Sequence, residues 1–475
     1  MSIEKTRQII AERLKAHGQA HLLSFWAQLD SRQQSRLLSQ LEKLDLPAID
    51  DWIARYIKNP AAGNLGTDLA VAPSYPPVPD GPRQQRKYSE AIDLGKKLIS
   101  DGKVAAFIVA GGQGTRLGFD GPKGDFPVTP VKNKTLFQTF AETIAAVRKK
   151  YDAICPWYVM TSPLNHDETV RIFRANDYYG LNTDDIFILE QGTLPNFDFD
   201  GKVLLADKDC ISWSPDGHGG SLKALYESGA LKDMKKRGIE LVSYFQVDNP
   251  LVNIFDPLFI GLHALDDAQM SSKAVQKKNP EEKVGVFALV NGKVTVIEYS
   301  DLSKEQAQRR NPDGTLTFDL GSIAIHIINT SFVEKLNEKG FSLPLHRAVK
   351  TIPHIDRHGE QIAPDKPNGI KLESFVFDAL PLASRSVILQ TVRQQEFAPV
   401  KNATGTDSVD SAKELIIARA AHWLESAGIN VPRKPDQSVD AIIEIAPSFA
   451  LEKADIKTKL KDIPTIKPKD KIYLA

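Results

Sequence analysis

Short apolar runs that alternate with amphipathic helical stretches constrain this chain more than any other feature of its sequence. Runs rich in β-branched and aromatic residues occur at 104–110, 157–160, 186–189 and 239–247. Between the first two, residues 135–149 have a helical period, and one face of that helix collects Leu136, Phe137, Phe140, Ile144 and Val147. Strands that alternate with helices indicate an α/β domain built on a largely parallel sheet.

The length of 475 residues suits two or three domains. Residues 1–100 predict an N-terminal helical region with a proline-rich linker at 59–83, where we expect no regular structure. Residues 101–386 predict the central α/β domain. Residues 387–475 predict a small C-terminal α/β domain that carries a helix and a lysine-rich tail.

The charge balance limits the classes of partner. The chain has 60 basic and 60 acidic residues, so no overall attraction to nucleic acid or to an acidic membrane is expected. It has two cysteines, too few for a disulfide framework, and no apolar run long enough to span a bilayer. We therefore expect a cytoplasmic protein that binds neither nucleic acid nor membrane, and the sequence indicates no protein partner.

A β-hairpin is predicted in the second half of the central domain. Residues 284–290 and 293–299 alternate around Asn291-Gly292, a dipeptide typical of two-residue hairpin turns. Paired residues in such a hairpin have a constant sum of numbers, so Val290 should face Lys293. By the same count Gly285 should face Glu298.

A glycine-rich loop follows the first strand of the central domain. Its run GGQGTRLG contains Gly111, Gly112, Gly114 and Gly118. Glycines at such a place let backbone N–H groups approach an anion or a ring edge. The run lacks the Gly-Lys-Ser/Thr ending of a Walker A loop, and Leu117 stands where a dinucleotide fingerprint has glycine. Arg116 and Lys123 add two cations to the loop.

The run IVAGGQGTRLGFDGPKGDFPV resembles the signature of the UDP-sugar pyrophosphorylases, most closely their UDP-N-acetylhexosamine branch. The resemblance continues through PWYVMTSP, EQGTLPNFDFDGKV, SPDGHGGSLKAL, FQVDNPLV, PDKPNGIKLESFVFD and APVKNATG. It implies a Rossmann-like nucleotidyltransferase domain of glycosyltransferase-A type, with a mixed, mainly parallel sheet. It also implies the reaction of UTP with a hexose 1-phosphate to give a UDP-sugar and pyrophosphate, with Mg²⁺ as cofactor.

The resemblance assigns phosphate chemistry to four residues. Arg116, Lys123 and Lys401 are the expected catalytic cations, which would neutralise the phosphates of UTP. Asp248, at the end of the run 239–247, is the expected Mg²⁺ ligand and a nucleotide contact.

The nucleotide and the sugar are assigned to two further sets of residues. The expected nucleotide-binding residues are Gly111, Gly112, Gln191, Gly217 and His218. The Gln191 amide offers a donor and acceptors, which match the edge of uracil. The expected sugar-binding residues are Gly285, Glu298 and Ser322.

Two departures from the family pattern bear on the substrate. The acetamido branch commonly has asparagine where this chain has Ser322 and His218, and a Gly-His-Gly run looks more like UDP-glucose and broad UDP-sugar pyrophosphorylases. The hypothesis is therefore N-acetylglucosamine 1-phosphate first, with glucose 1-phosphate or a broad range as the alternative. A non-catalytic nucleotide-sugar binding protein and a nicotinamide-linked oxidoreductase are the rivals outside this reaction, and Leu117 argues against the second.

Overall fold

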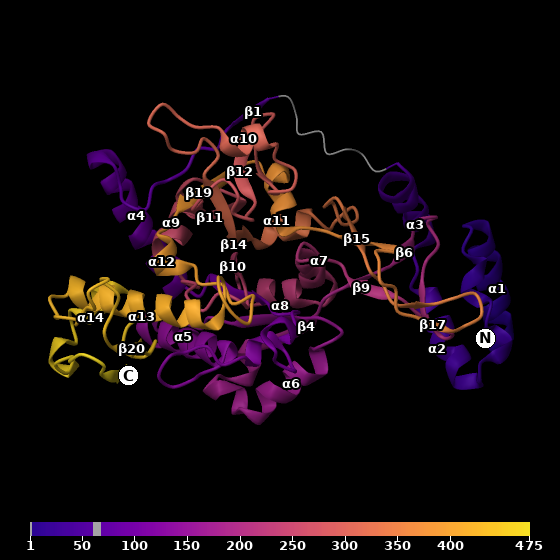
Figure 1. Cartoon of the computed structure of the whole chain (residues 1–475), viewed down its shortest axis with the longest axis horizontal. Helices are drawn as coiled ribbons and strands as arrows, with labels where there is room; N and C mark the ends of the chain where they lie inside the picture. Colours follow the sequence, from indigo (N-terminus) through magenta and orange to yellow (C-terminus); the bar gives the residue numbers. More distant parts are fainter. Residues whose placement is uncertain (1, 60–67) are drawn as a thin grey trace. The chain divides into compact units, whose positions relative to one another are not determined.

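The chain forms two compact units, each assembled from three separate segments. The structure, a computed structural model, describes residues 2–59 and 68–475 (Figure 1). The first unit comprises Met1–Leu65, Gln191–Ser221 and Leu343–Asp378, and the second comprises Gly66–Glu190, Leu222–Ser342 and Ala379–Ala475. The boundaries predicted at 101 and 387 do not coincide with this division, because the helical N-terminal region shares a unit with two later segments.

The second unit is built on one large sheet with a parallel centre. Its central strands, in spatial order, are β10 (Leu241–Gln246), β2 (Val104–Val109), β3 (Trp157–Thr161) and β4 (Ile186–Glu190). All neighbours in this set are parallel. These are the four runs read from the sequence, so the prediction of a mainly parallel sheet is confirmed.

Beyond β10 the same sheet continues with strands that pair antiparallel, except that β19 is parallel to β11. Its further strands are β14 (Leu320–Asn329), β12 (Val286–Val290), β13 (Lys293–Ile297), β11 (Met270–Gln276), β19 (Ser386–Gln390) and β1 (Leu69–Val71). In the hairpin of β12 and β13, Val290 faces Lys293, as predicted. The turn residues Asn291 and Gly292 both have positive φ, which a two-residue turn of this kind requires.

Helices α4 (Gly81–Ser100), α5 (Leu136–Tyr151) and α9 (Pro257–Leu265) cover one face of the sheet. The buried face of α5 is the one predicted from its period. Helices α4 and α9 cross closely, because a Cβ on Gly95 would overlap the carbonyl oxygen of Pro257. Gly261 has the same relation to the carbonyl of Ala91, so two glycines permit the contact.

Helix α8 (Ala230–Lys236) lies on the opposite face, where the Tyr158 hydroxyl of β3 donates to Asp233 at 2.6 Å. Helix α11 (Thr330–Lys335) follows β14, and the amide of Asn337 just beyond it donates to Leu222 in the first turn of α7 (Gly220–Glu227). Further helices of this unit are α6 (His166–Ala175), α10 (Lys304–Gln308) and α12 (Arg393–Glu396). The sheet is thus covered by helices on both faces.

The C-terminal residues of the second unit have an apolar cluster of their own. It forms between α13 (Val409–Ser426), α14 (Lys453–Ile456) and a pair of parallel strands, β20 (Ile442–Ile445) and β21 (Lys471–Leu474). Strand β19, which was predicted to belong to this C-terminal region, instead pairs with β11 in the large sheet.

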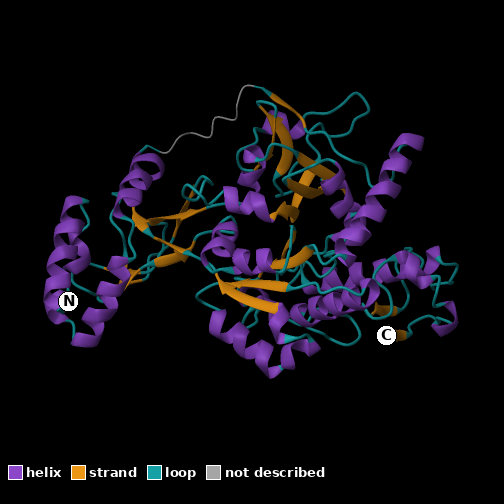
Figure 2. Ribbon diagram, turned by 180° about the vertical axis from the view of Figure 1, so that it is seen from behind, coloured by secondary structure: helices purple, strands orange, loops and turns teal. Residues whose placement is uncertain are grey.

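The first unit combines helices with small antiparallel sheets, whose strands are orange in Figure 2. Its helices are α1 (Ile3–Ala16), α2 (Ser31–Glu42) and α3 (Leu46–Trp52). Its strands include β15 (His346–Lys350), β18 (Gly369–Glu373) and β6 (Phe197–Asp198), which form one sheet. Short two-stranded ladders pair β5 (Thr193–Pro195) with β9 (Trp213–Pro215), β7 (Leu205–Asp207) with β8 (Cys210–Ile211), and β16 (His354–Ile355) with β17 (Gln361–Ile362).

The proline-rich linker prediction is corrected in its second half. Strand β1 pairs with β12 through Val71 and Ala288, and α4 already begins at Gly81. Residues 60–67 of this stretch lie outside the described residues. Within the described residues, no helix combines the length and the apolar character that crossing a bilayer requires.

Candidate active site

The glycine-rich loop follows the carboxyl end of β2, and two buried polar side chains donate hydrogen bonds to its carbonyls. The Ser162 hydroxyl donates to the carbonyl of Gly111 at 2.8 Å. The Asn165 amide donates to the carbonyls of Ala110 and Gly112 at 2.9 and 3.3 Å. Three successive carbonyls of the loop are thus tied to the residues that follow β3.

Glycine is required at particular points of this loop by close contacts. A Cβ on Gly114 would lie 2.7 Å from the ring of Phe119, and Gly118 has a φ of 70°, in the left-handed region. A Cβ on Gly124 would overlap the ring of Phe137 on α5. The segment that carries Lys123 therefore lies directly against α5, and the amide of Lys123 donates to Gly112 at 3.0 Å.

The expected phosphate-binding cations are neighbours in the second unit. Burial lowers the pKa of the Lys123 ammonium, and the nearby charges of Lys401 and Arg116 lower it further, while Asp248 raises it. Each of these three groups is therefore close enough to Lys123 to act on its charge. Excess positive charge beside a half-buried lysine favours the binding of an anion at this place.

Asp248 follows β10 and is the acidic member of this group. Within the described residues no cluster of three or more His, Cys, Asp or Glu side chains could hold a metal ion on its own. Mg²⁺, however, is commonly bound by one or two carboxylates together with water and substrate phosphates. Asp248 is a single half-buried carboxylate near cations. It therefore suits a Mg²⁺ ion whose other ligands are water and the phosphates of the bound nucleotide.

The expected sugar-binding residues lie together at the end of the hairpin. The Ser322 amide donates to the carbonyl of Gly285 at 2.8 Å. A Cβ on Gly285 would lie 3.1 Å from Oε1 of Glu298, so the two residues face each other, as the hairpin count predicted. The structure thus brings Gly285, Glu298 and Ser322 into one place.

These sugar-site residues share a sheet edge with Asp248. Strand β14 runs antiparallel to β10, with Leu241 opposite Asn329 and Tyr244 opposite His326. The start of β14, which holds Ser322, therefore lies beside the carboxyl end of β10. Asp248 follows that end of β10. Ligands of open α/β sheets bind at this edge.

The first unit holds the other expected nucleotide-binding residues. Gln191 is 7% exposed, and its Nε2 donates to Asp216 Oδ1 at 2.9 Å and to the carbonyl of Gly217 at 2.7 Å. Gly217 has a φ of 86°, and a Cβ there would overlap the carbonyl oxygen of Ser374. The donor that we expected Gln191 to offer to uracil is thus engaged within the protein, and its Oε1 is the atom suited to a base.

His218 packs among aromatic rings of the same unit. Its ring stacks on Phe375, with centroids 5.2 Å apart, and its Nδ1 accepts from the amide of Val376 at 3.1 Å. Burial lowers the pKa of His218 to about 4. The ring is therefore neutral near pH 7 and carries its proton on Nε2, where it can donate a hydrogen bond.

Three supporting residues were missed from the sequence, namely Ser162, Asn165 and Asn249. The first two follow β3 and hold the glycine-rich loop, and their position after a parallel strand was a usable signal. Asn249 follows Asp248, and no local pattern reveals its contacts with Glu396 and Ala398, which lie almost 150 residues away in the sequence.

Comparison with known proteins identifies the family. Residues 78–474 match the family described as UTP–glucose-1-phosphate uridylyltransferase. The chain belongs to this family. Enzymes of this family are nucleotidyltransferases, and the matched residues include all the expected site residues.

Two curated relatives and one solved structure place the chain within the family. The human protein named UDP-N-acetylhexosamine pyrophosphorylase-like protein 1 is 37% identical over 441 residues, which cover 89% of this chain and 86% of the human one. The UDP-N-acetylglucosamine pyrophosphorylase of Saccharomyces cerevisiae is 36% identical over 442 residues, with 89% and 91% covered. The crystal structure of the Trypanosoma brucei uridine diphosphate N-acetylglucosamine pyrophosphorylase, in complex with an inhibitor, matches with a TM-score of 0.83 and 26% identity over 100% of this chain and 98% of that one.

Proposed function

We propose that this uridylyltransferase converts UTP and N-acetylglucosamine 1-phosphate into UDP-N-acetylglucosamine and pyrophosphate. The observation that carries the proposal is that the charges of Arg116, Lys401 and Asp248 all act on Lys123, and that Asp248 follows β10 at the carboxyl edge of the parallel strands. The names of the relatives, which include N-acetylglucosamine pyrophosphorylases, support the choice of sugar.

The reaction requires positioning and charge neutralisation, and it requires no covalent nucleophile. A phosphate oxygen of the sugar 1-phosphate attacks the α-phosphorus of UTP and forms a new P–O bond. The bond from the α-phosphorus to the bridging oxygen breaks, and pyrophosphate leaves with that oxygen and its electron pair. Two polyanions must meet, and correct positioning alone can contribute about 7–11 kcal/mol.

The cations would serve the phosphates in different ways. Lys123 and Lys401 supply point charges, whereas the planar guanidinium of Arg116 can bind two phosphate oxygens at once. Asp248 would hold Mg²⁺, which when bound would neutralise phosphate charge. The family resemblance suggested this ion, and the lone carboxylate beside the cations is compatible with it.

The nucleotide and the sugar would be recognised by mostly neutral groups. In the second unit, backbone groups of Gly111 and Gly112 would contact the base. In the first unit, Oε1 of Gln191 is suited to accept from an N–H of uracil. Glu298 would accept hydrogen bonds from sugar hydroxyls beside Gly285, and the Ser322 hydroxyl would reach the substituent at C2. The proposed compartment is the cytoplasm, on the basis of two cysteines in 475 residues.

Glucose 1-phosphate is the second candidate substrate, and Ser322 is the observation that favours it. A serine side chain is shorter than the asparagine that the acetamido branch commonly has, so it gives less contact to an N-acetyl group. His218, in the first unit, is a second position at which the acetamido branch commonly has asparagine.

The test is pyrophosphate release from UTP and Mg²⁺ with one sugar 1-phosphate at a time. We expect release with N-acetylglucosamine 1-phosphate at a higher kcat/KM than with the galactose-configured or unacetylated analogues. A preference for glucose 1-phosphate would replace the first substrate by the second. No release with any hexose 1-phosphate would overturn the proposed activity.

A further inference from the structure

Two segments far apart in sequence meet beside Asp248. The first is the turn after β10, which begins with Asp248 and Asn249. The second runs from Glu396 to Val400 and leads directly into Lys401. The Val400 amide donates to the carbonyl of Asp248 at 2.8 Å, so the residue before the catalytic lysine is bonded to the acidic residue itself.

Asn249 makes the remaining bonds between these segments. Its side chain is buried, and its Nδ2 donates to the carbonyl of Glu396 at 2.8 Å. Its Oδ1 accepts from the amide of Ala398 at 3.0 Å and from that of Leu251 at 3.3 Å. One amide therefore satisfies backbone groups on both segments, and no smaller side chain could reproduce this pattern.

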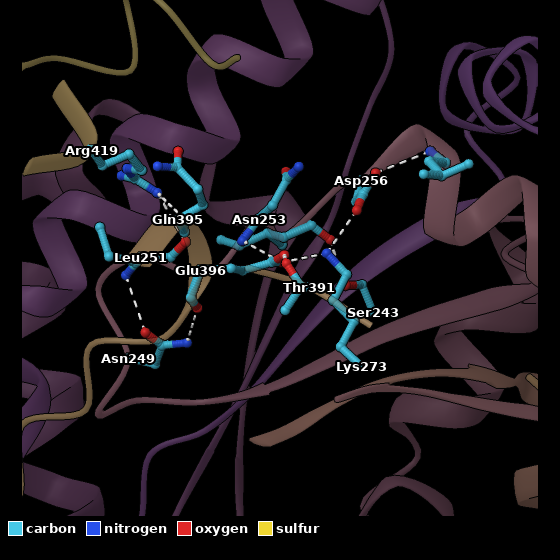
Figure 3. A network of polar contacts seen from close by, with 12 residues as sticks. Ser243, Asn249, Leu251, Asn253, Asp256, Lys273, Thr391, Gln395, Glu396 and Arg419 are labelled. Carbon is cyan, nitrogen blue, oxygen red and sulfur yellow. Dashed lines mark hydrogen bonds and ion pairs between the residues drawn. The ribbon is translucent and has the colours of Figure 1, made fainter. Parts of the chain in front are cut away.

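The start of the second segment is anchored by buried charges (Figure 3). The Lys273 ammonium of β11 is fully buried and bonds to the Glu396 carboxylate and to Asp256, the latter at 2.7 Å. The Thr391 hydroxyl donates to the other oxygen of Glu396 at 2.9 Å, and the Asn253 amide donates to the first at 3.3 Å. Glu396 is thus held on several sides, which fixes the point from which the segment extends toward Lys401.

A second link joins the same two segments from α13. The Arg419 guanidinium donates to the carbonyl of Leu251 at 2.9 Å and to that of Gln395 at 3.4 Å, and Figure 3 shows it beside both. Beyond Val400 the amide of Lys401 donates to the carbonyl of Asp407 at 2.6 Å, just before α13 begins. The backbone of Lys401 is therefore held on both sides, whereas its side chain is exposed.

We propose that Asn249 is a positioning residue that sets the distance between the Lys401 ammonium and Asp248 by joining the 396–400 segment to the end of β10. The inference rests on the proposed function, in which Lys401 and Asp248 serve the same phosphates. Asn249 itself touches no reacting atom in this scheme. Its effect on the reaction passes through Lys401, so the loss of either side chain removes the same contribution.

A double-mutant cycle tests this coupling. The variants Asn249→Ala, Lys401→Ala and the double variant are assayed for pyrophosphate release in the full-length chain, with kcat and both KM values. We expect Lys401→Ala to lower kcat by about 10²–10³-fold and Asn249→Ala by about 10²-fold, which is typical of a small misplacement. The double variant should be no slower than Lys401→Ala alone, because the same contribution cannot be lost twice.

Asn337→Ala is the matched control for a merely structural loss. Asn337 is also a buried asparagine, and its amide donates to the carbonyls of Leu222 and Val333 at 3.2 and 2.8 Å. Both alanine variants should lower the Tm, but only Asn249→Ala should lower kcat. Hydrogen exchange gives a second readout, since the 396–402 peptide should exchange at least about tenfold faster in Asn249→Ala than in the control.

The possible outcomes separate the inference from the proposed function. The positioning role would be overturned if the fall in kcat of the double variant equalled the product of the two single falls, or if Asn249→Ala left kcat unchanged. Either result would leave the proposed function intact. An unchanged kcat in Lys401→Ala would instead overturn the assigned role of Lys401, and the inference with it. If Asn249→Ala fails to fold, Asn249→Ser, which keeps one polar group, takes its place in the cycle with the same expected non-additivity.

Discussion

Replacing Gly285 by alanine is expected to weaken binding of the sugar 1-phosphate and to leave UTP binding unchanged. The new Cβ would lie 2.7 Å from Cγ1 of Val296, where 3.4–4 Å is ordinary contact, and 3.1 Å from Oε1 of Glu298. Val296 is buried and β-branched, so it cannot rotate away easily. Overpacking of this kind costs about 1–3 kcal/mol of stability.

The effect on the substrate follows from the displacement of Glu298. A carboxylate that must move by a few tenths of an ångström weakens its hydrogen bonds to the sugar, and a hydrogen bond to a charged group is worth about 1.5–3 kcal/mol. Losing about half of that contribution raises the KM for the sugar 1-phosphate roughly tenfold at most. The KM for UTP should stay within about twofold of its original value, a margin below 0.5 kcal/mol.

The assay is pyrophosphate release with each substrate varied in turn, together with thermal unfolding. Gly314→Ala is a suitable control, because its φ of 85° strains an alanine while an added Cβ would meet no described atom within 4 Å. The control should lose stability without a change in either KM. Equal rises in both KM values for Gly285→Ala, or the same sugar-specific rise in the control, would refute the placement of the sugar beside Glu298.

Three other predictions concern single side chains. Lys123→Ala should lower kcat by about 10²–10³-fold while the Kd for the UDP-sugar, measured by calorimetry, changes far less, because the charge acts on the phosphate that is transferred or leaves. Ser322→Asn should raise the kcat/KM ratio for N-acetylglucosamine over glucose 1-phosphate by about 2- to 10-fold, the value of one hydrogen bond, and an unchanged ratio would place the acetamide pocket elsewhere. Burial lowers the pKa of His263 to about 4. The unfolded chain therefore binds this proton more readily, and stability should fall by about 3 kcal/mol as the pH drops from 6.5 through 4. Urea unfolding across that range should show a flatter profile for His263→Gln, and an identical profile would contradict the assignment.

Features set by local pattern could be predicted from the sequence. The register of the hairpin followed from the period of two and from Asn291-Gly292, and Val290 does face Lys293. The parallel strands followed from short, continuous apolar runs, which are typical of strands buried on both faces. The buried face of α5 followed from its helical period. The closeness of Lys401 and Asp248 to Lys123 did not follow from local pattern and was expected only from the family resemblance.

Features that depend on contacts distant in sequence could not be predicted in the same way. Strand β1 lies in a stretch rich in prolines, and only the free edge of β12 gives residues 69–71 an extended partner. Whether the Gln191 amide offers its donor to a ligand depends on Asp216, which lies 25 residues further along the chain. The contacts of Asn249 with the 396–400 segment are likewise invisible until the fold brings the two together.

The three-segment assembly of the first unit has a consequence for synthesis on the ribosome. The apolar faces of its first helices, with Leu37 and Leu41, share a core with Ile370 and Leu372 of the last segment. That segment starts about 280 residues after the first one ends. At roughly 5–20 residues per second, this last segment follows the helices by about 15–55 s, whereas Phe197 and Ile211 of the middle segment follow sooner. Until the last segment is made, part of this apolar face stays uncovered, so the nascent chain should depend on chaperones more than its finished form suggests.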